Sequence, residues 1–211
     1  MKKIFLHPWP LRLWHWANAL VAVTLIITGI QLRVIGVADL PPKSTVLLVH
    51  KYVGWGMAAT WISWLLYSLI SGHLSRQFAI RRRDFPGTIR QARYYLVSIF
   101  REEEIPFRPS PEEKFNPLQK IAYCAIMCIF TPVLVVTGVL LNDIPLFRQN
   151  ILLWNLVGML DALHVLCAYV LVLYMIIHIY MSTLGRTAFS HIKAMLVGYE
   201  EEPETAKEVT Q

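Results

Sequence analysis

Four long apolar segments constrain the fold of this chain more than any other feature. They lie at about 13–36, 45–71, 117–141 and 153–184. A helix of roughly 20 apolar residues crosses the hydrocarbon core of a bilayer. The composition agrees with such crossings, because 55% of the 211 residues are hydrophobic and only 16% are charged. We therefore predict an all-α integral membrane four-helix bundle.

The first and fourth segments each have a feature that an ordinary membrane span lacks. The first segment follows Lys2 and Lys3 as a signal peptide would, but it is rich in Trp and lacks a small-x-small cleavage site, so we predict a retained helix. The fourth segment exceeds one crossing, and its start, ILLWNLVGML, is predicted to lie along the surface. Residues 1–199 thus form one predicted domain that ends in a short surface helix. The charged residues 200–211 are predicted to be a disordered cytoplasmic tail.

Positive charge indicates how the bundle is oriented. Of the 20 Lys and Arg residues, 16 precede the first segment, lie between the second and third or in the first turn of the third (Lys120), or follow the fourth. The other four are Arg33, Lys43, Lys51 and Arg148. Cytoplasmic loops carry the excess of Lys and Arg, so both termini and the central loop are predicted to be cytoplasmic. The net charge of +6 is explained by this topology and by anionic membrane lipid, and it does not indicate nucleic acid.

The central loop, 73–116, contains one amphipathic stretch. Apolar residues recur at helical spacing at Ile89, Ala92, Leu96, Ile99 and Phe100. Arg90 and Arg93 fall on another face. This pattern predicts a cytoplasmic amphipathic helix that lies on the membrane surface.

The fourth segment carries two histidines in an otherwise apolar helix. His164 and His178 are fourteen residues apart, which places them within roughly 40° of one face and about 21 Å apart along the axis. A histidine inside a membrane span is costly unless a partner offsets its burial. Haem iron is such a partner, because it binds a neutral imidazole on each side and its porphyrin is apolar. Two buried histidines that are hydrogen-bonded to neighbouring helices remain the alternative.

The first two segments supply one histidine each. His15 lies one turn inside the start of the first segment, and His50 lies near the start of the second. Gly29 follows His15 by fourteen residues and shares nearly the same face, whereas Gly54 is one turn after His50. A bare backbone at these glycines lets a flat ring approach closely. Ordinary packing of small residues between helices explains the glycines equally well.

The topology sorts the four histidines into two pairs. The first segment runs outward and the second and fourth run inward, so His15 and His178 both lie near the cytoplasmic face. By the same reasoning His50 and His164 both lie near the outer face. We therefore predict two haems at two depths, with these four histidines as iron ligands. A haem-free anchor would not require matched depths, and a metal-ion site would need ligands clustered within a few ångströms.

The third segment has no histidine. Pro132 is predicted to kink it. Its sequence LVVTGVLL echoes LIITGIQL of the first segment, so Gly138 is predicted to pack at the outer haem as Gly29 does. Surface positions are predicted for the remaining histidines, His7, His73 and His191. Small apolar packing roles are predicted for the cysteines, Cys124, Cys128 and Cys167.

Several motifs together resemble a known family. They are RLWHWANAL, VHKYVG, KFNPLQK-x-x-Y and the H-x13-H of the fourth segment, and the tail run HIKAMLVGY is similar as well. The chain resembles, over nearly its whole length, the dihaem cytochrome b gamma subunits of membrane formate dehydrogenases. The cytochrome b subunits of uptake hydrogenases and thiosulfate reductases are also similar. The four histidines with their spacing are the most specific part of this resemblance.

The resemblance implies the cofactors, partners and location. It implies two haem b groups, one on the cytoplasmic side held by His15 and His178 and one on the outer side held by His50 and His164. It implies a multi-pass protein of a prokaryotic inner membrane. Electrons would be exchanged at the outer face with an Fe–S or cytochrome c partner subunit, and a further catalytic subunit would hold the other substrate. This chain would supply the quinone-reactive part of a respiratory oxidoreductase complex.

A quinone site is also implied, beside the cytoplasmic-side haem. The quinone would be menaquinone or ubiquinone, and the asparagine before the third segment, here Asn116, would contribute to its site. Pro117 and Leu118 depart from the glycine-containing stretch that the family pattern leads one to expect. From the residues alone, Asn116 is equally well a helix cap ahead of Pro117.

Two other function classes remain open from the sequence. One is a stand-alone quinone-linked cytochrome b oxidoreductase that acts on a small diffusible donor. The other is a non-redox module, either a haem-free membrane anchor subunit or a transporter whose histidines bind a metal. Co-purification with an outer Fe–S or multihaem protein would count against the first, and bound haem would count against the second.

Overall fold

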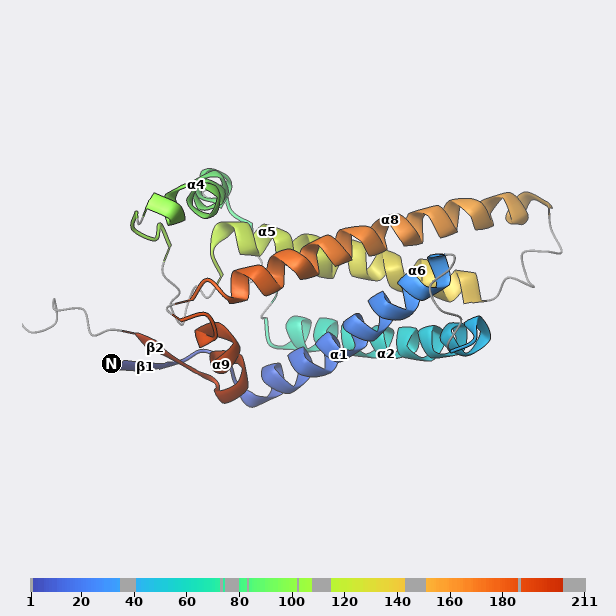
Figure 1. Cartoon of the computed structure of the whole chain (residues 1–211), viewed down its shortest axis with the longest axis horizontal. Helices are drawn as coiled ribbons and strands as arrows, with labels where there is room; N and C mark the ends of the chain where they lie inside the picture. Colours follow the sequence, from blue (N-terminus) through green and yellow to red (C-terminus); the bar gives the residue numbers. More distant parts are fainter. Residues whose placement is uncertain are drawn as a thin grey trace, which may run out of the picture. The chain divides into compact units, whose positions relative to one another are not determined.

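The computed structural model confirms an all-α fold with four helices long and apolar enough to cross a membrane (Figure 1). It describes residues 2–34, 41–72, 74, 80–82, 84–101, 103–107, 115–142, 151–185 and 187–202. The four spans are α1 (Trp9–Arg33), α2 (Lys43–Ile70), the composite Pro117–Asn142, and α8 (Ile151–Ser182) from Leu156 onward. The described residues group into two compact units, one from Ala17 to Leu173 and one from the flanking residues.

The helix bounds agree with the sequence to within a few residues, with two differences. Helix α1 begins at Trp9, four residues before the predicted start, and positions 35 and 36 lie outside the described residues. Helix α8 is continuous over 32 residues. No break separates 151–160, which we expected to lie along the surface, from the rest of α8. The segment contains no proline, so nothing in it interrupts the backbone hydrogen bonds.

The third span changes its hydrogen bonding just before Pro132. It consists of α5 (Pro117–Ala125), a π-helical turn η2 (Ile126–Phe130) and α6 (Thr131–Asn142). In the π-turn, the Thr131 N–H donates to the carbonyl of Ile126 and not to that of Met127. Pro132 has no N–H, so it cannot serve Met127 either. The predicted interruption at Pro132 therefore takes the form of a π-turn. This turn leaves the Met127 carbonyl without a donor from its own helix.

Trp61 of α2 supplies the missing donor. Its indole Nε1–H donates to the Met127 carbonyl oxygen over 2.8 Å. A backbone group left unpaired in hydrocarbon is costly, so a proline in a membrane helix requires such a partner. Trp61 thereby ties α2 to the third span at the π-turn.

Replacing Trp61 with phenylalanine is expected to destabilise the bundle. The ring volume is largely kept, but the Met127 carbonyl loses its donor, which costs about 1 kcal/mol in a membrane protein. The measurement is the thermal unfolding midpoint of the detergent-purified chain. Trp55→Phe is the matched control, because Trp55 is 52% exposed on the same helix. Equal midpoints for the two variants would show that the Trp61 bond contributes nothing.

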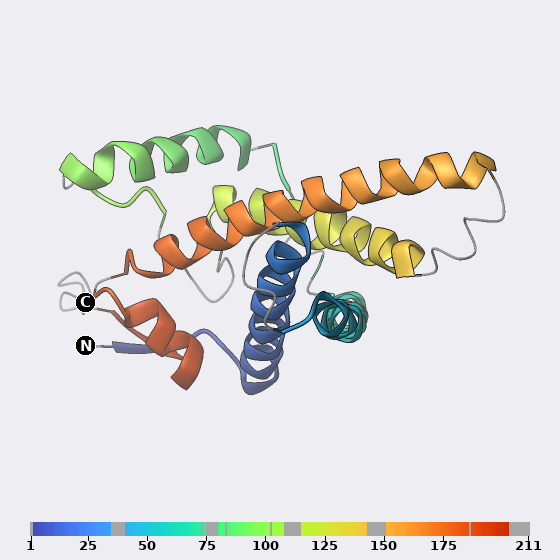
Figure 2. The same cartoon turned by 45° about the vertical axis from the view of Figure 1, so that its right-hand side comes forward.

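The predicted amphipathic helix of the central loop is present. Helix α4 (Asp84–Leu96) continues into the 3-10 turn η1 (Ser98–Arg101) and packs against α5 (Figure 2). Its buried face is polar, whereas its large apolar side chains are exposed. These exposed residues are Phe85, Ile89, Leu96 and Phe100. An exposed apolar stripe opposite a polar, protein-facing side is typical of a helix on a membrane surface, and that position stays a prediction.

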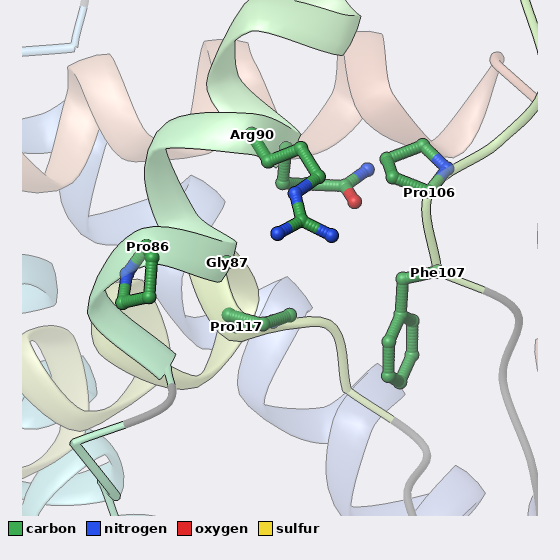
Figure 3. Close-up of a pocket in the computed structure, with 7 residues that line it drawn as sticks. Pro86, Gly87, Arg90, Pro106, Phe107 and Pro117 are labelled. Carbon is green, nitrogen blue, oxygen red and sulfur yellow. The ribbon is translucent and has the colours of Figure 1, made fainter.

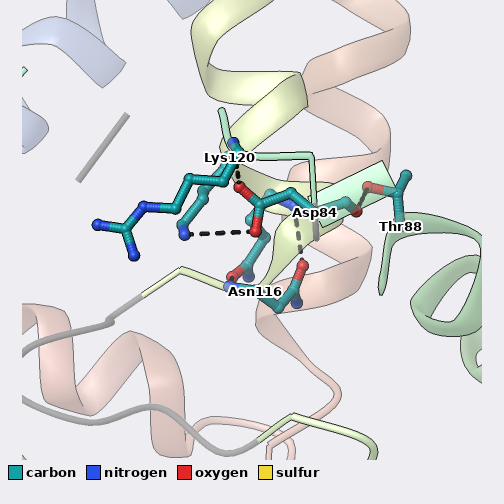
Figure 4. Close-up of polar contacts among 6 residues, drawn as sticks. Asp84, Thr88, Asn116 and Lys120 are labelled. Carbon is teal, nitrogen blue, oxygen red and sulfur yellow. Dashed lines mark hydrogen bonds and ion pairs between the residues drawn. The ribbon is translucent and has the colours of Figure 1, made fainter. Parts of the chain in front are cut away.

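Buried polar groups join α4 to the start of α5 (Figure 4). Asp84 Oδ1 lies 3.7 Å from Lys120 Nζ, and both side chains are almost fully buried. Asp84 Oδ2 also accepts the Arg81 backbone N–H over 2.7 Å. Close approach of the two helices depends on Gly87, because a Cβ there would lie 2.8 Å from Pro117 Cγ.

The chain termini form a unit of their own. Strand β1 (Lys2–Phe5) pairs antiparallel with β2 (Tyr199–Glu202), which follows α9 (Ser190–Val197), as Figure 1 shows. Gly198 has φ 94°, a conformation that favours glycine, and its carbonyl accepts the Leu6 N–H over 3.0 Å. The Trp16 indole of α1 donates to the Met195 carbonyl over 3.3 Å.

This pairing corrects the prediction of a disordered tail from residue 200. Residues 200–202 form part of β2, and only 203–211 of the predicted tail lie outside the described residues. The acidic composition of EEEP suggested a segment unable to fold alone. The strand register places Lys2 opposite Glu202 and Lys3 opposite Glu201. The partner that orders these residues is remote in sequence.

Candidate functional site

The structure brings His50 and His164 together within one unit. His50 belongs to α2 and His164 to α8, and their ring centroids are 6.4 Å apart with an angle of 72° between the ring planes. Both rings are half-buried. The predicted outer pair is therefore a pair in space, with a gap between the rings.

A threonine on a neighbouring helix holds each of these imidazoles. Thr28 Oγ1 of α1 lies 2.7 Å from His50 Nδ1, and Thr137 Oγ1 of α6 lies 2.8 Å from His164 Nδ1. Both threonines are buried. A hydrogen bond at one ring nitrogen leaves the other nitrogen available as a ligand.

A glycine follows each of these threonines and lies close to the same imidazole. A Cβ at Gly29 would lie 3.5 Å from His50 Cε1, and a Cβ at Gly138 would lie 3.3 Å from His164 Cε1. The glycines therefore pack against the outer histidines themselves. Gly54 differs, because a Cβ there would meet nothing within 4 Å. It borders open space, and its predicted role beside a flat ring stays a prediction.

The second pair is His15 with His178, in the unit formed by the flanking residues. Their ring centroids are 6.2 Å apart and their planes are inclined by 50°. Tyr174 stacks on His178, with centroids 5.7 Å apart and 18° between the planes. His15 Nδ1 is buried and has no hydrogen-bond partner among the described residues. In this pair, no threonine holds His15 among the described residues, whereas a threonine contacts each histidine of the first pair.

The spacing within each pair matches the requirement of a single iron atom. Metal–imidazole nitrogen bonds are about 2 Å long, so two imidazoles on opposite sides of one iron have ring centroids roughly 6 Å apart. The observed 6.2 and 6.4 Å fit this value. Two neutral nitrogen ligands in an apolar helical setting are also the donor set that haem iron accepts. The residues present therefore fit haem at both pairs.

Other metal chemistry finds little support in the part of the chain described. No group of three or more His, Cys, Asp or Glu side chains there could hold a metal ion. Cys167 is buried and Cys128 is exposed on its helix. Among the remaining histidines, His191 is exposed as predicted, His7 is half-buried beside Gly198, and His73 lies outside the described residues.

Asn116 is placed by the structure as a helix cap. Its Oδ1 accepts the Gln119 N–H over 2.8 Å, and the Gln119 side chain accepts the Asn116 N–H over 3.1 Å. This capping box and Pro117 at the first helical position explain why α5 begins there. Asn116 Nδ2 also donates to the Tyr95 hydroxyl over 3.1 Å. Burial raises the pKa of the Tyr95 phenol, so it stays protonated at neutral pH.

A small pocket lies where α4 meets α5 (Figure 3). Its volume is about 190 Å³, and Arg90, Phe107 and Pro117 are among its lining residues. Ligand pockets usually measure about 300–1,000 Å³, so this one is smaller than a typical ligand pocket. None of the four paired histidines lines it.

Sequence reasoning missed three features of these sites. Thr28 and Thr137 were not recognised as partners of histidines, although the repeated Thr-Gly dipeptide was the available signal. The Trp61 bond to the main chain could not be inferred from residue types. The pairing of Asp84 with Lys120 had no signal either, since Asp84 stands in a run of arginines.

Comparison with known proteins gives a family and a relative for this chain. A model of the family described as "Prokaryotic cytochrome b561" matches residues 6–198. The chain is also 33% identical over 205 residues to "Putative cytochrome YdhU" of Escherichia coli (strain K12), covering 94% of this chain and 75% of that protein. The matched region contains all four paired histidines. The family implies haem b binding and electron transfer in a multi-pass membrane protein. The chain belongs to the prokaryotic cytochrome b561 family.

Proposed function

We propose that this chain is the dihaem membrane subunit of a respiratory oxidoreductase, which passes electrons across the inner membrane to or from a quinone. The observation that carries the proposal is the presence of two histidine pairs with ring centroids 6.2 and 6.4 Å apart. Each pair comes from two helices and fits one six-coordinate iron. Fourteen residues of α8 separate His164 from His178, so one helix contributes a ligand to each proposed haem.

The four histidines bind and orient the proposed cofactors. A haem iron with two imidazole ligands supplies a one-electron couple and has no open position for oxygen. His50 and His164 would hold the outer-side haem, and His15 and His178 the cytoplasmic-side haem. Gly29 and Gly138 keep the backbone close to the outer imidazoles, and Gly54 borders open space one turn after His50. Lipid and the apolar helices exclude water from these ligands.

A quinone site beside the cytoplasmic-side haem belongs to the same proposal. Its support is the resemblance to dihaem subunits that carry such a site. Capping and the bond to Tyr95 use one lone pair and one N–H of the Asn116 amide. Among the described contacts, one further lone pair and one further N–H of this amide are left for a quinone carbonyl or hydroxyl. The substrate would be menaquinone or ubiquinone.

Partners at the outer face complete the proposal. An Fe–S or cytochrome c subunit would exchange electrons with the outer haem, and a catalytic subunit would hold the other substrate. Both chain termini and α4 would lie on the cytoplasmic side, as the distribution of Lys and Arg predicts.

The test is haem quantitation with a reduced-minus-oxidised spectrum on the detergent-purified chain, followed by addition of a soluble quinol. We expect two b-type haems per chain, both reduced by the quinol. One haem per chain would overturn the dihaem proposal. No haem, in cells with an adequate haem supply, would leave a membrane anchor. Two haems that the quinol fails to reduce would overturn the quinone part alone.

A further inference from the structure

Thr28 and Thr137 share an arrangement that occurs twice in the fold. Each threonine precedes a glycine on its helix, and each contacts Nδ1 of a histidine on the next membrane-spanning helix along the chain. Thr28 is 7% exposed and Thr137 is 3% exposed. Two independent occurrences of one arrangement, at the two histidines of one pair, indicate a shared role.

The direction of these hydrogen bonds follows from the single hydrogen of a hydroxyl. Thr28 Oγ1 donates to the Thr24 carbonyl over 2.7 Å, and Thr137 Oγ1 donates to the Val133 carbonyl over 2.7 Å. That hydrogen is therefore committed to the main chain, a common arrangement for threonine in helices. Each hydroxyl oxygen then accepts from the facing ring, so Nδ1 of His50 and of His164 carries the hydrogen.

We infer that Thr28 and Thr137 are positioning residues that fix the tautomer and orientation of the outer haem ligands. With the hydrogen on Nδ1, Nε2 of each imidazole presents its lone pair as a ligand. A hydrogen bond from the far nitrogen also makes the ligand more basic. A more basic ligand favours ferric over ferrous iron and lowers the midpoint potential of the outer haem. This inference rests on the proposed function, because it assumes that the pair binds iron.

The two histidine pairs differ in the hydrogen-bond partner of Nδ1, so the inner pair serves as a comparison for the outer pair. His15 Nδ1, in the other pair, is buried without a hydrogen-bond partner among the described residues. Loss of either threonine should therefore act on the outer haem and leave the inner haem unchanged. A general loss of helix packing would affect both.

The experiment is a redox titration, with electron paramagnetic resonance of the ferric haems, on the purified chain and its variants. Thr28→Val and Thr137→Val keep the shape and remove the hydroxyl, whereas Thr28→Ser and Thr137→Ser keep it. His164 also has a hydrogen bond to the main chain of Leu134, which Thr137→Val leaves in place. Thr24→Val is the matched control, because Thr24 Oγ1 bonds only to the Leu20 carbonyl of its own helix in the described contacts. A tenfold change in a one-electron equilibrium corresponds to about 59 mV. We expect an upward shift of roughly this size in Thr28→Val and a smaller one in Thr137→Val, because the Leu134 main chain still bonds to His164.

The outcomes separate this inference from the proposal on which it rests. Wild-type protein without two haems would overturn the proposed function. Two haems in the valine variants with the outer potential and spectrum unchanged would overturn the threonine role. If a valine variant loses the outer haem, its serine counterpart should retain it. Equal loss in the serine variant would show that the threonine methyl group packs the helices and that the hydroxyl positions nothing.

Discussion

Replacing His178 with leucine is expected to lower the haem content of the purified chain from two b-type haems to one. Leucine fills the space in α8 but offers no ligand, so a haem iron shared with His15 would lose one of its two histidine ligands. The ring centroids of this pair are 6.2 Å apart, and no second histidine stands at that position in the described residues. The His50–His164 pair keeps both ligands. The measurement is haem per chain, with the spectrum of the haem that remains.

His50→Leu and His191→Leu complete this series. His50→Leu should also reduce two haems to one, but the haem left would be the inner one. The exposed His191 belongs to neither pair, and its leucine variant should keep two haems. Under the proposed order of electron transfer, the soluble quinol reduces the haem left in His50→Leu and not the haem left in His178→Leu. Quinol reduction that survives in His178→Leu would show that this order is wrong.

Replacing Asp84 with asparagine should weaken the docking of α4 on α5. The change removes the Asp84 carboxylate that lies 3.7 Å from the buried Lys120 ammonium. Removing one member of a buried ion pair costs about 3 kcal/mol, because the remaining charge stays desolvated. Asparagine still accepts the Arg81 N–H, so the backbone turn before α4 is kept. Hydrogen exchange of the α4 amides should therefore accelerate by about two orders of magnitude, since each factor of ten corresponds to about 1.4 kcal/mol.

Asp161→Asn provides the comparison for that variant. Asp161 Oδ2 lies 2.9 Å from Arg33 Nη2, a shorter distance than in the Asp84 pair, but the two side chains are 52% and 43% exposed. Exposed pairs contribute at most about 1 kcal/mol. Similar effects of the two substitutions on local exchange would show that burial of the Asp84–Lys120 pair does not determine its strength.

The span positions and the histidine pairs were predictable because each depends on regular helix geometry. A run of apolar residues sets the length of a span, and the fourteen residues between His164 and His178 set their shared face. Topology then matched His15 with His178 and His50 with His164, and the structure brings both pairs together. These predictions needed only the chain direction of each helix.

Features that depend on contacts between particular side chains were not predictable in this way. Pro132 was recognised as a helix-disrupting residue, but the donor for the freed carbonyl, Trp61, lies 66 residues from Met127. Residues 200–202 were predicted to be disordered on local composition, whereas their strand partner is at the other end of the chain. Asn116 had two open interpretations, and its capping box is confirmed while a quinone contact remains a proposal.

In the Thr-Gly arrangement, the protein orients the histidine ligands and the proposed cofactor connects the helical hairpins that carry them. Each threonine holds a histidine of its own helical hairpin: Thr28 of α1 holds His50 of α2, and Thr137 of α6 holds His164 of α8. The orientation of each histidine is therefore fixed by a contact within its own hairpin, which forms one half of the bundle. The proposed iron would bond across the halves, because His50 and His164 come from different hairpins. The outer haem would then cross-link the two hairpins. Its loss would weaken the contact between the hairpins, while each histidine would stay oriented by the threonine of its own hairpin.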